Sequence, residues 1–298
     1  MRLTPSTFGP LAPHLLELAS TCERYGLPLT LVGGFGLVLR RQWRQEQGER
    51  TLIEAVPPAR ATEDFDVLLT LELLADDARR LAMRTALAES GYQVEERMKY
   101  LHFIKPESGV AGRRNVKVDF LSPPVPAGHT ALKENAFRVG PRRSTEADKL
   151  HGYKTAEAEL LTGEVLTLPL EGPDPLNTER ETQVSLPHPF MLTLMKLCAF
   201  RDEYEGRKSG GRQRRDLAAK HVADVYTLVA LLTLPEAASL SALSAQNAAH
   251  PVVQDARSIV RTLLANDQSP GTLLLRESLR LAPGDLQTFL DMLNEAYG

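Results

Sequence analysis

A short acidic strand constrains this chain more than any other feature of its sequence. Residues 64–71 read DFDVLLTL, an apolar run whose leading end is acidic. Side chains at i and i+2 of a strand share a face. We therefore expect Asp64 and Asp66 to converge while Phe65 turns into the core. An isolated pattern of this kind is also typical of a solvated strand edge, so it needs a second feature beside it.

A third aspartate lies inside another predicted strand. Residues 116–121 read VKVDFL and alternate with period 2. Asp119 stands between Val118 and Phe120, where a carboxylate is costly unless it faces a metal or a wet cleft. An adjacent strand would bring Asp119 beside the pair at 64 and 66; the alternative is a charge on an edge strand.

Three converging carboxylates predict a cation. Carboxylates forced together repel, and one of them would prefer a proton unless a cation is present. Magnesium favours a few carboxylates together with substrate phosphate oxygens. We expect two Mg²⁺ ions, with Mn²⁺ as a substitute, held by Asp64, Asp66 and Asp119. One ion would lower the pKa of an attacking hydroxyl, the other would neutralise a triphosphate, and Asp119 could accept the hydroxyl proton.

A glycine pair precedes these strands. The run LTLV at 29–32 leads into Gly33 and Gly34, and a helix is predicted over about 35–44. Glycines without a Cβ let backbone N–H groups approach phosphate oxygens, and a helix N-terminus adds positive potential. Taken alone, the pair is only a turn.

The order of elements predicts an α+β protein. Helical spacing over 11–25 is followed by strands and helices that imply a small mixed sheet with helices packed on it. Residues 122–150 read as loop-rich. From about Pro187 onwards the sequence pattern is helical. We therefore expect an α/β domain over 1–186 and a helical domain over 187–298 that completes the nucleotide site.

The composition argues against a highly basic nucleic-acid binder, a disulfide-rich protein and a membrane protein. The chain has 298 residues, 43% hydrophobic content and a formal net charge of −3, which gives no overall electrostatic case for nucleic acid. Its two cysteines form no disulfide framework and are expected to be buried thiols. No signal peptide or membrane-spanning run is predicted. We expect a soluble, cytoplasmic monomer with no membrane partner.

These motifs resemble a known group. The runs VGGFGLVLRR, RATEDFDVLL and VKVDFL look like the nucleotidyltransferase superfamily that includes DNA polymerase beta. More narrowly they resemble the AbiEii-type toxins of abortive-infection and type IV toxin–antitoxin systems. The similarity covers about 29–232 and is strongest at 60–69. It implies a DNA polymerase beta-like nucleotidyltransferase fold followed by a C-terminal helical domain.

The resemblance also implies an activity and its residues. The expected enzyme is a Mg²⁺-dependent nucleotidyltransferase that moves a nucleoside monophosphate from an NTP to an RNA acceptor, tRNA in some members, and a cognate antitoxin is an expected partner. It implies magnesium at the three aspartates and triphosphate binding near the glycine turn. The implied nucleotide-binding residues are Gly33, Gly34, Arg60, Thr62, Lys196, Lys220 and Asp224.

The chain departs from the family pattern in three places. His221 follows Lys220 where the family has an aspartate, and Phe35 stands where a small hydroxyl residue is frequent. Residues 41–59 read as an insertion that could reshape the acceptor side. Lys220 and Asp224 could instead belong to a solvated row of charges, and Lys196 could be a lysine that snorkels out of an apolar helix.

One basic cluster could bind the acceptor. Residues 207–215 read RKSGGRQRR and are predicted to form a loop with five cations and no acid. They are either a solvated surface loop or a clamp for RNA phosphates. The five cations are Arg207, Lys208, Arg212, Arg214 and Arg215.

Three hypotheses follow from these patterns. The first is the nucleotidyltransferase toxin, and the second is an enzyme of the same fold that modifies a small molecule such as an antibiotic. The third is a catalytically silent nucleotide- or protein-binding module, which His221 and Phe35 favour. The preferred nucleotide and the acceptor are not specified by the sequence.

Overall fold

The computed structural model is an α+β protein with a mixed sheet and two compact units. It describes residues 1–57, 62, 64–107, 114–161 and 164–298, and only the backbone at 107, 114 and 207–211. The first unit comprises residues 1–39 and 60–187, and the second comprises residues 40–59 and 188–298. The second unit thus takes residues 40–59 from the domain expected over 1–186.

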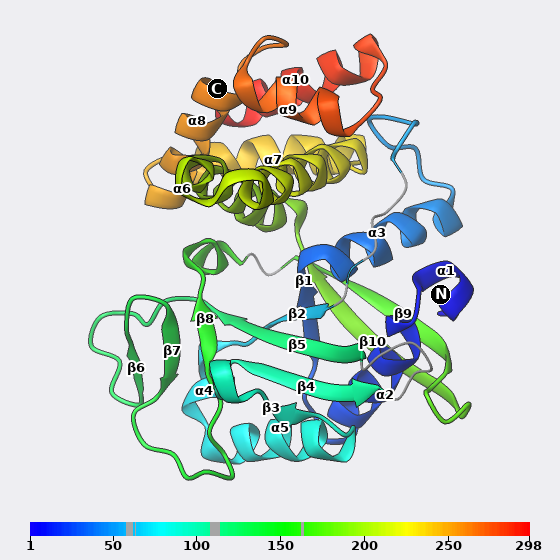
Figure 1. Ribbon diagram of the computed structural model, residues 1–298, viewed down its shortest axis with the longest axis vertical. Coiled ribbons are helices and arrows are strands. Elements are labelled where there is room, and N and C mark those ends of the chain that lie inside the picture. The colour runs from blue at the N-terminus through cyan, green and yellow to red at the C-terminus, as the bar shows by residue number, and fades with distance from the viewer. Residues whose placement is uncertain (58–61, 63, 108–113, 162–163) are drawn as a thin grey trace. The chain divides into compact units, whose positions relative to one another are not determined.

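A mixed ten-stranded sheet organises the first unit (Figure 1). Its main path runs β6-β7-β8-β5-β2-β1-β10-β9, and β4 pairs with both β3 and β5. Pairing is parallel for β1–β10, β2–β5 and β5–β8, and antiparallel for β1–β2 and β4–β5. The strands are β1 (Leu29–Val32), β2 (Asp64–Leu68), β3 (Gln93–Val94), β4 (His102–Glu107), β5 (Arg114–Ser122), β6 (Leu132–Glu134), β7 (Arg138–Pro141), β8 (Gly152–Lys154), β9 (Val165–Pro173) and β10 (Glu179–Pro187).

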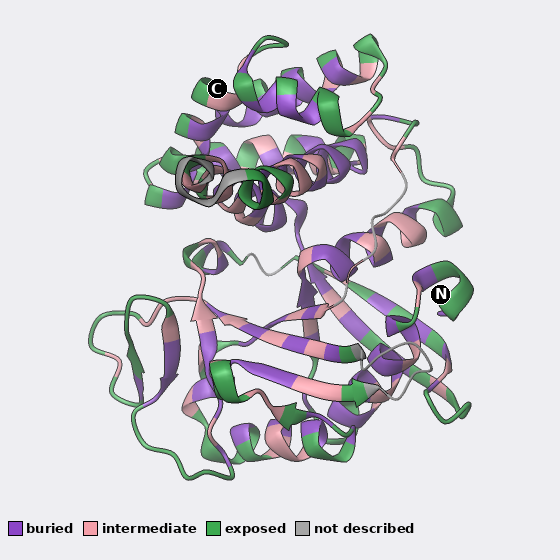
Figure 2. Ribbon diagram, in the orientation of Figure 1, coloured by how far each residue is buried: buried purple, intermediate pink, exposed green. Residues whose placement is uncertain are grey.

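Alternating side chains give the two central strands one apolar face. Phe65 of β2 and both Val118 and Phe120 of β5 are at most 1% exposed. The rings of Phe120 and Phe103 meet edge to face at 5.6 Å. Figure 2 shows the alternation of buried and partly exposed positions along β5. The predicted inward turn of Phe65 is confirmed, and the aspartates therefore occupy the opposite face.

Helices pack on the sheet of the first unit. The predicted helix over 11–25 is confirmed, because α2 spans Leu11–Arg24 and buries Leu15, Leu18 and Cys22. It packs against β9, β10 and α5. The helices that begin in this unit are α1 (Pro5–Phe8), α2 (Leu11–Arg24), α3 (Gly33–Gln47), α4 (Leu71–Ala75) and α5 (Asp77–Glu89), with short 3₁₀ turns η1 (Glu96–Met98) and η2 (Ala156–Leu160).

Residues 122–150 contain strands that the sequence did not reveal. They were expected to be loop-rich, but β6 and β7 form an antiparallel pair and β7 continues the sheet through β8. These strands have three to four residues each. Strands this short, broken by proline and glycine, give too few alternating positions for a period to be recognised.

The second unit is helical. Its helices are α6 (Pro189–Ala230), α7 (Leu234–Gln246), α8 (Pro251–Leu263), α9 (Pro270–Ser278) and α10 (Pro283–Tyr297). The predicted apolar stripe of Val225, Leu228, Val229 and Leu232 is confirmed as buried. Residues 207–215, expected to be a loop, carry helical backbone within α6.

The two halves of α6 fold back on each other. Lys196 and Asp224 form an ion pair of 2.8 Å although 28 residues separate them, a span that a straight helix would stretch to about 42 Å. Glu203 and Arg214 pair at 3.1 Å across the same reversal. The chain therefore turns around between these pairs, close to the Ser-Gly-Gly of the predicted loop.

Residues 40–59 belong to the helical unit because of specific contacts. The backbone N–H groups of Leu52 and Ile53 donate to carbonyls of Leu232 and Ala230 at 2.8 and 3.3 Å. The guanidinium groups of Arg40 and Arg44 both bind the Glu236 carboxylate. That carboxylate also accepts from the backbone N–H of Thr233, at the N-terminus of α7, in a capping box.

No single helix in the described ranges is both long and apolar enough to cross a bilayer. Only two helical segments taken jointly, Arg212–Ala230 and Leu234–Gln246, meet that test, and they meet at a bend of 117°.

A buried ion pair ties α5 to the segment before β8. Arg80 is 1% exposed, and its Nη2 lies 2.5 Å from Oδ2 of Asp148. Oδ1 of Asp148 accepts hydrogen bonds from the backbone N–H and hydroxyl of Thr145. Burial by itself would raise the pKa of Asp148, but the hydrogen bonds from Thr145 and Arg80 lower it to about 2.

Asp148→Asn is expected to destabilise the protein by about 3 kcal/mol at neutral pH, because it leaves the buried Arg80 guanidinium without this counter-charge. The folded-state pKa lies below the unfolded value of about 3.9, so the parent loses this stabilisation as the pH falls from about 4 towards 2. Denaturant unfolding at a series of pH values checks the destabilisation of the variant and the loss of stability of the parent at low pH. Asp77→Asn is the control, since Asp77 also pairs with Arg80 but its side chain is 88% exposed. A gap between Asp148→Asn and parent that stays constant with pH would contradict the assignment.

Candidate active site

The strand register brings the predicted aspartates together. In the parallel pair β2–β5, Asp66 lies directly across from Asp119, and Asp64 lies across from Lys117. All four residues therefore share the face opposite Phe65. The meeting of residues 66 and 119 is what the sequence pattern required.

Asp66 lies against the glycine turn. Gly33 has φ +68°, and a Cβ placed on it would lie 1.7 Å from Oδ2 of Asp66. Gly33 is also the first residue of α3, so the Asp66 carboxylate lies at the positive end of that helix. The structure gives this glycine a role that the sequence did not predict: it makes room for Asp66. Gly34 follows it as a buried residue within α3.

Asp119 is surrounded by charged groups. Its Oδ2 lies 2.7 Å from the Lys117 ammonium, and its Oδ1 lies 3.5 Å from Nε2 of His102. Burial raises the pKa of Asp119 to about 6; Lys117 lowers it, and the charges of Asp64 and Glu95 raise it. The register places Asp64 and Asp66 on the same face as Asp119, so the cluster contains more than one acid.

Three neighbours of Asp119 were missed at the level of sequence. Lys117 was identifiable, because it lies two residues before Asp119 and therefore on the same face. His102 lies directly across from Asp119 in the β4–β5 pair, and its Nδ1 is 3.0 Å from the Glu95 carboxylate. No local motif predicts that pairing. Burial and the nearby Lys117 lower the pKa of His102, whereas Glu95 raises it.

Three other residues of the first unit that the sequence singled out are Thr62, Arg60 and Phe35. The Thr62 hydroxyl donates to Oδ1 of Asp64 at 2.9 Å, so Thr62 orients an aspartate of the site. Arg60 lies outside the described residues. Phe35, which stands where a hydroxyl was expected, is 1% exposed and meets the Phe65 ring edge to face at 5.2 Å. It is therefore a core residue.

The fit to a magnesium ion rests on the donor atoms. Asp64, Asp66 and Asp119 offer carboxylate oxygens, the ligand type that Mg²⁺ prefers. Oδ1 of Asp119 is buried and has no hydrogen-bond partner among the described residues. Within those residues, however, no three His, Cys, Asp or Glu side chains already lie in a ligating arrangement. The aspartates fit the ion in the kind of donor atom and share one face of the sheet, but they are not yet in a ligating arrangement, and Lys117 holds one oxygen of Asp119 that a ligand would use.

Lys196 and Asp224, two predicted nucleotide-binding residues of the helical unit, form an ion pair with each other. Nζ of Lys196 lies 2.8 Å from Oδ2 of Asp224, and both side chains are buried. Lys196 was predicted to be a phosphate ligand or a snorkelling lysine, and its observed partner is a buried carboxylate on the other half of α6. Lys220 and His221 are half-buried on the same helix.

The basic cluster is partly neutralised. Arg214 pairs with Glu203 at 3.1 Å, and Arg215 pairs with Glu277 of α9. Glu277 comes from another helix, so the local sequence could not reveal it, whereas Glu203 precedes the cluster within α6. Arg212 is exposed, and the side chains of Arg207 and Lys208 lie outside the described residues.

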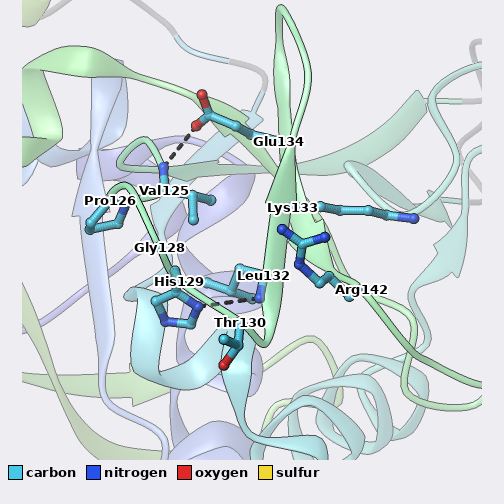
Figure 3. A pocket seen from close by; sticks show the side chains of 9 residues that line it. All are labelled: Val125, Pro126, Gly128, His129, Thr130, Leu132, Lys133, Glu134 and Arg142. Carbon is cyan, nitrogen blue, oxygen red and sulfur yellow. Dashed lines mark hydrogen bonds between the residues drawn. The ribbon is translucent and has the colours of Figure 1, made fainter.

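A hollow of about 580 Å³ lies away from the aspartates, beside β6 and β7 (Figure 3). The Glu134 carboxylate reaches the backbone N–H of Val125 at 2.8 Å on one side of it. Lys133 and Arg142 also line it. A second hollow of about 560 Å³ borders Asp148.

Comparison of the chain with protein-family models, with curated proteins and with solved structures found no match.

Gly33→Ala is expected to unfold the first unit at a lower temperature and to displace Asp66. The backbone conformation alone costs roughly 1–2 kcal/mol for a residue with a Cβ. The collision with Asp66 adds to this cost. Gly26→Ala is the matched control, because Gly26 also has φ +68° and its Cβ would meet nothing within 4 Å. Equal losses of stability in thermal unfolding would contradict the close approach of Gly33 and Asp66.

Lys196→Met is expected to cost about 3 kcal/mol or more, because it leaves the buried Asp224 carboxylate without its cation. Replacing both partners, Lys196→Met with Asp224→Leu, is expected to recover most of the loss. Denaturant unfolding compares the stability of both variants with that of the parent, with the exposed Arg276→Met of α9 as control. A lysine reserved for a nucleotide would instead leave the stability of the unliganded protein unchanged when substituted.

Proposed function

We propose that this chain is a Mg²⁺-dependent nucleotidyltransferase that transfers a nucleoside monophosphate from an NTP to an RNA acceptor. The carrying observation is the pairing of Asp66 with Asp119 across β2 and β5, with Asp64 on the same face and Gly33 against Asp66. Three acids from two strands that are distant in the sequence share one face of a sheet whose other face is apolar core. An ordinary solvated strand edge does not need such an arrangement.

We propose further that the first unit has the DNA polymerase beta-like nucleotidyltransferase fold. The order strand, glycine turn and helix over 29–47 is followed by the acidic strand β2 and by its parallel neighbour β5. The role as the toxin of an abortive-infection or toxin–antitoxin system, with tRNA as acceptor and an antitoxin as partner, follows from the resemblance over 29–232.

The residues of the site would have separate roles in binding the metal, orienting its ligands and accepting a proton. When bound, Mg²⁺ supplies charge neutralisation of the triphosphate and a lowered pKa for the attacking hydroxyl. Asp64, Asp66 and Asp119 would hold it. The hydroxyl of Thr62 orients Asp64, and Asp66 lies at the N-terminus of α3, the positive end of that helix. Oδ1 of Asp119, which has no hydrogen-bond partner among the described residues and lies 3.5 Å from Nε2 of His102, is the atom to accept the acceptor's proton.

One observation favours a second candidate, the catalytically silent binding module. The Lys117 ammonium pairs with Asp119 at 2.7 Å, on the face where a cation is expected. A lysine there can substitute for a metal ion and keep the acidic cluster folded without catalysis. The two candidates differ in what they predict for magnesium.

Incubating the protein with Mg²⁺, each radiolabelled NTP and total RNA is expected to label RNA. Asp66→Asn and Asp119→Asn are expected to reduce labelling by roughly 100-fold or more, because a metal site contributes several kcal/mol to transition-state stabilisation. Glu96→Gln, an exposed acid on η1, is the control and should label like the parent.

Lys117→Met tests whether Lys117 competes with an ion, and the parent protein separates the two candidates. In an enzyme whose ion competes with Lys117, this variant should bind Mn²⁺ more tightly than the parent in a direct titration. In a silent module the parent shows neither labelling nor NTP binding that depends on Mg²⁺. Equal labelling by the parent and by Asp66→Asn would refute the assignment of the site.

A further inference from the structure

A second cationic surface lies on the strands that the sequence did not reveal. Lys133 of β6 lies directly across from Gly140 of β7. Arg138 and Arg142 lie two residues to either side of Gly140, and the Arg142 N–H continues the ladder by donating to Ala131. Lys133, Arg138 and Arg142 therefore share one face of this hairpin.

The cations of this face are not neutralised locally. Among the described residues, none of Lys133, Arg138 and Arg142 forms a salt bridge, and the buried Nε of Arg138 has no hydrogen-bond partner. The neighbouring Glu134 is already bound by Lys154 and by the Val125 N–H. Residues 125–154 carry six Lys or Arg and three Asp or Glu, a formal charge of +3 in a chain whose net charge is −3.

The field of these cations acts on a buried histidine. The His151 ring lies over Gly140, where an added Cβ would come within 1.9 Å of it. Burial, together with the charges of Arg138, Lys149 and Lys133, lowers the pKa of His151 to about 4. The positive charge is therefore concentrated on this part of the sheet.

An exposed aromatic side chain stands beside the cations. Phe137, immediately before β7, is 50% exposed, and the Arg138 guanidinium lies over its ring at 5.7 Å. The turn is held by the Asn135 carboxamide, which accepts from the N–H groups of Phe137 and Arg138. An aromatic platform beside cations is the combination that binds single-stranded nucleic acid, by stacking one base and neutralising phosphates.

A continuous row of side chains joins this surface to the aspartates. Arg138 lies across from Tyr153 of β8, and Tyr153 lies across from Leu121 of β5, two residues beyond Asp119. The Tyr153 and His102 rings are 5.3 Å apart, and His102 lies across from Asp119. The hairpin cations and the carboxylates therefore belong to one face of one sheet.

We propose that the face of β6, β7 and β8 formed by Lys133, Arg138 and Arg142, with Phe137 at the turn beside it, binds the single-stranded end of an RNA acceptor and leads it towards Asp119. Phosphates lie on the three cations and one base stacks on Phe137. The hollow lined by Lys133 and Arg142 (Figure 3), at about 580 Å³, has the size of a small-molecule site and accepts a nucleotide unit. The surface itself stands on its charge and its aromatic group; its use as an acceptor track rests on the proposed function.

Binding of a fluorescein-labelled single-stranded oligoribonucleotide, measured by anisotropy without NTP, tests the surface. Phe137→Ala is expected to weaken binding about 10-fold through lost stacking, and Phe137→Trp to restore it. The triple variant K133A/R138A/R142A is expected to weaken it further. The slope of log affinity against log salt should fall by roughly 2, since each phosphate contact on a single strand contributes about 0.7.

Matched controls keep the result specific. Leu176→Ala removes an apolar side chain that is 81% exposed in the turn between β9 and β10, and Arg79→Ala removes an exposed cation on α5. Both should bind RNA like the parent. Circular dichroism verifies the fold, and Phe137→Ala, a substitution at an exposed turn, decides the outcome if the triple variant does not fold. Affinities that stay at the parent value in Phe137→Ala and in a folded triple variant overturn the proposal.

The experiment also separates the surface from the enzyme. Hairpin-dependent RNA binding without any nucleotidyl transfer retains the surface and removes the enzymatic proposal. If the hairpin variants transfer nucleotides to RNA as well as the parent does, the enzymatic proposal is retained and the surface is removed. Single-stranded DNA bound as tightly as RNA overturns the assignment to RNA, and a preference for duplex RNA overturns the stacking of a base on Phe137.

Discussion

Parallel pairing of β2 with β5 is the interaction on which the candidate site depends. The apolar side chains that follow the aspartates along each strand, Phe65 on β2 and Phe120 on β5, set its register by burial in the core. A slip of one residue would turn every acid of one strand inwards and expose its aromatic side chain. The hydrophobic effect on one face of the sheet thus places Asp66 beside Asp119 on the other, without any attraction between the carboxylates.

The fold tolerates these acids through different local devices. Asp64 accepts from the Thr62 hydroxyl, Asp66 lies at the N-terminus of α3, and Asp119 pairs with the Lys117 ammonium. The Lys117 ammonium lowers the pKa of Asp119, against the burial that raises it. Of these three devices, the Lys117 ammonium is the one that puts a full positive charge on a ligand oxygen, where it competes with a metal ion. Whether the cluster binds a cation therefore depends chiefly on how readily this one side chain moves away.

The sequence revealed what short-range periodicity encodes. The strands of Asp66 and Asp119 follow from alternating side chains, and helix α2 follows from apolar positions three and four residues apart. Partners from distant segments were not predictable: His102 and Glu95 reach Asp119 only through pairing of β4 with β5, and Glu277 reaches Arg215 only through tertiary packing. The short strands β6 to β8 lack a readable period. Gly33 was correctly placed near the site, but the group it accommodates is a side chain of the protein.

Residues 40–59 make each compact unit discontinuous along the chain. A fragment that ended after β10 would retain Arg40 and Arg44 but lose Glu236, and it would leave the N–H groups of Leu52 and Ile53 without their carbonyl partners. Such a truncation would expose arginines and apolar side chains that are inside in the intact molecule, which favours aggregation over an isolated folded piece. Dissection of this protein for biochemistry therefore has to excise or graft the 40–59 segment as well, rather than cut once between the sheet and the helices.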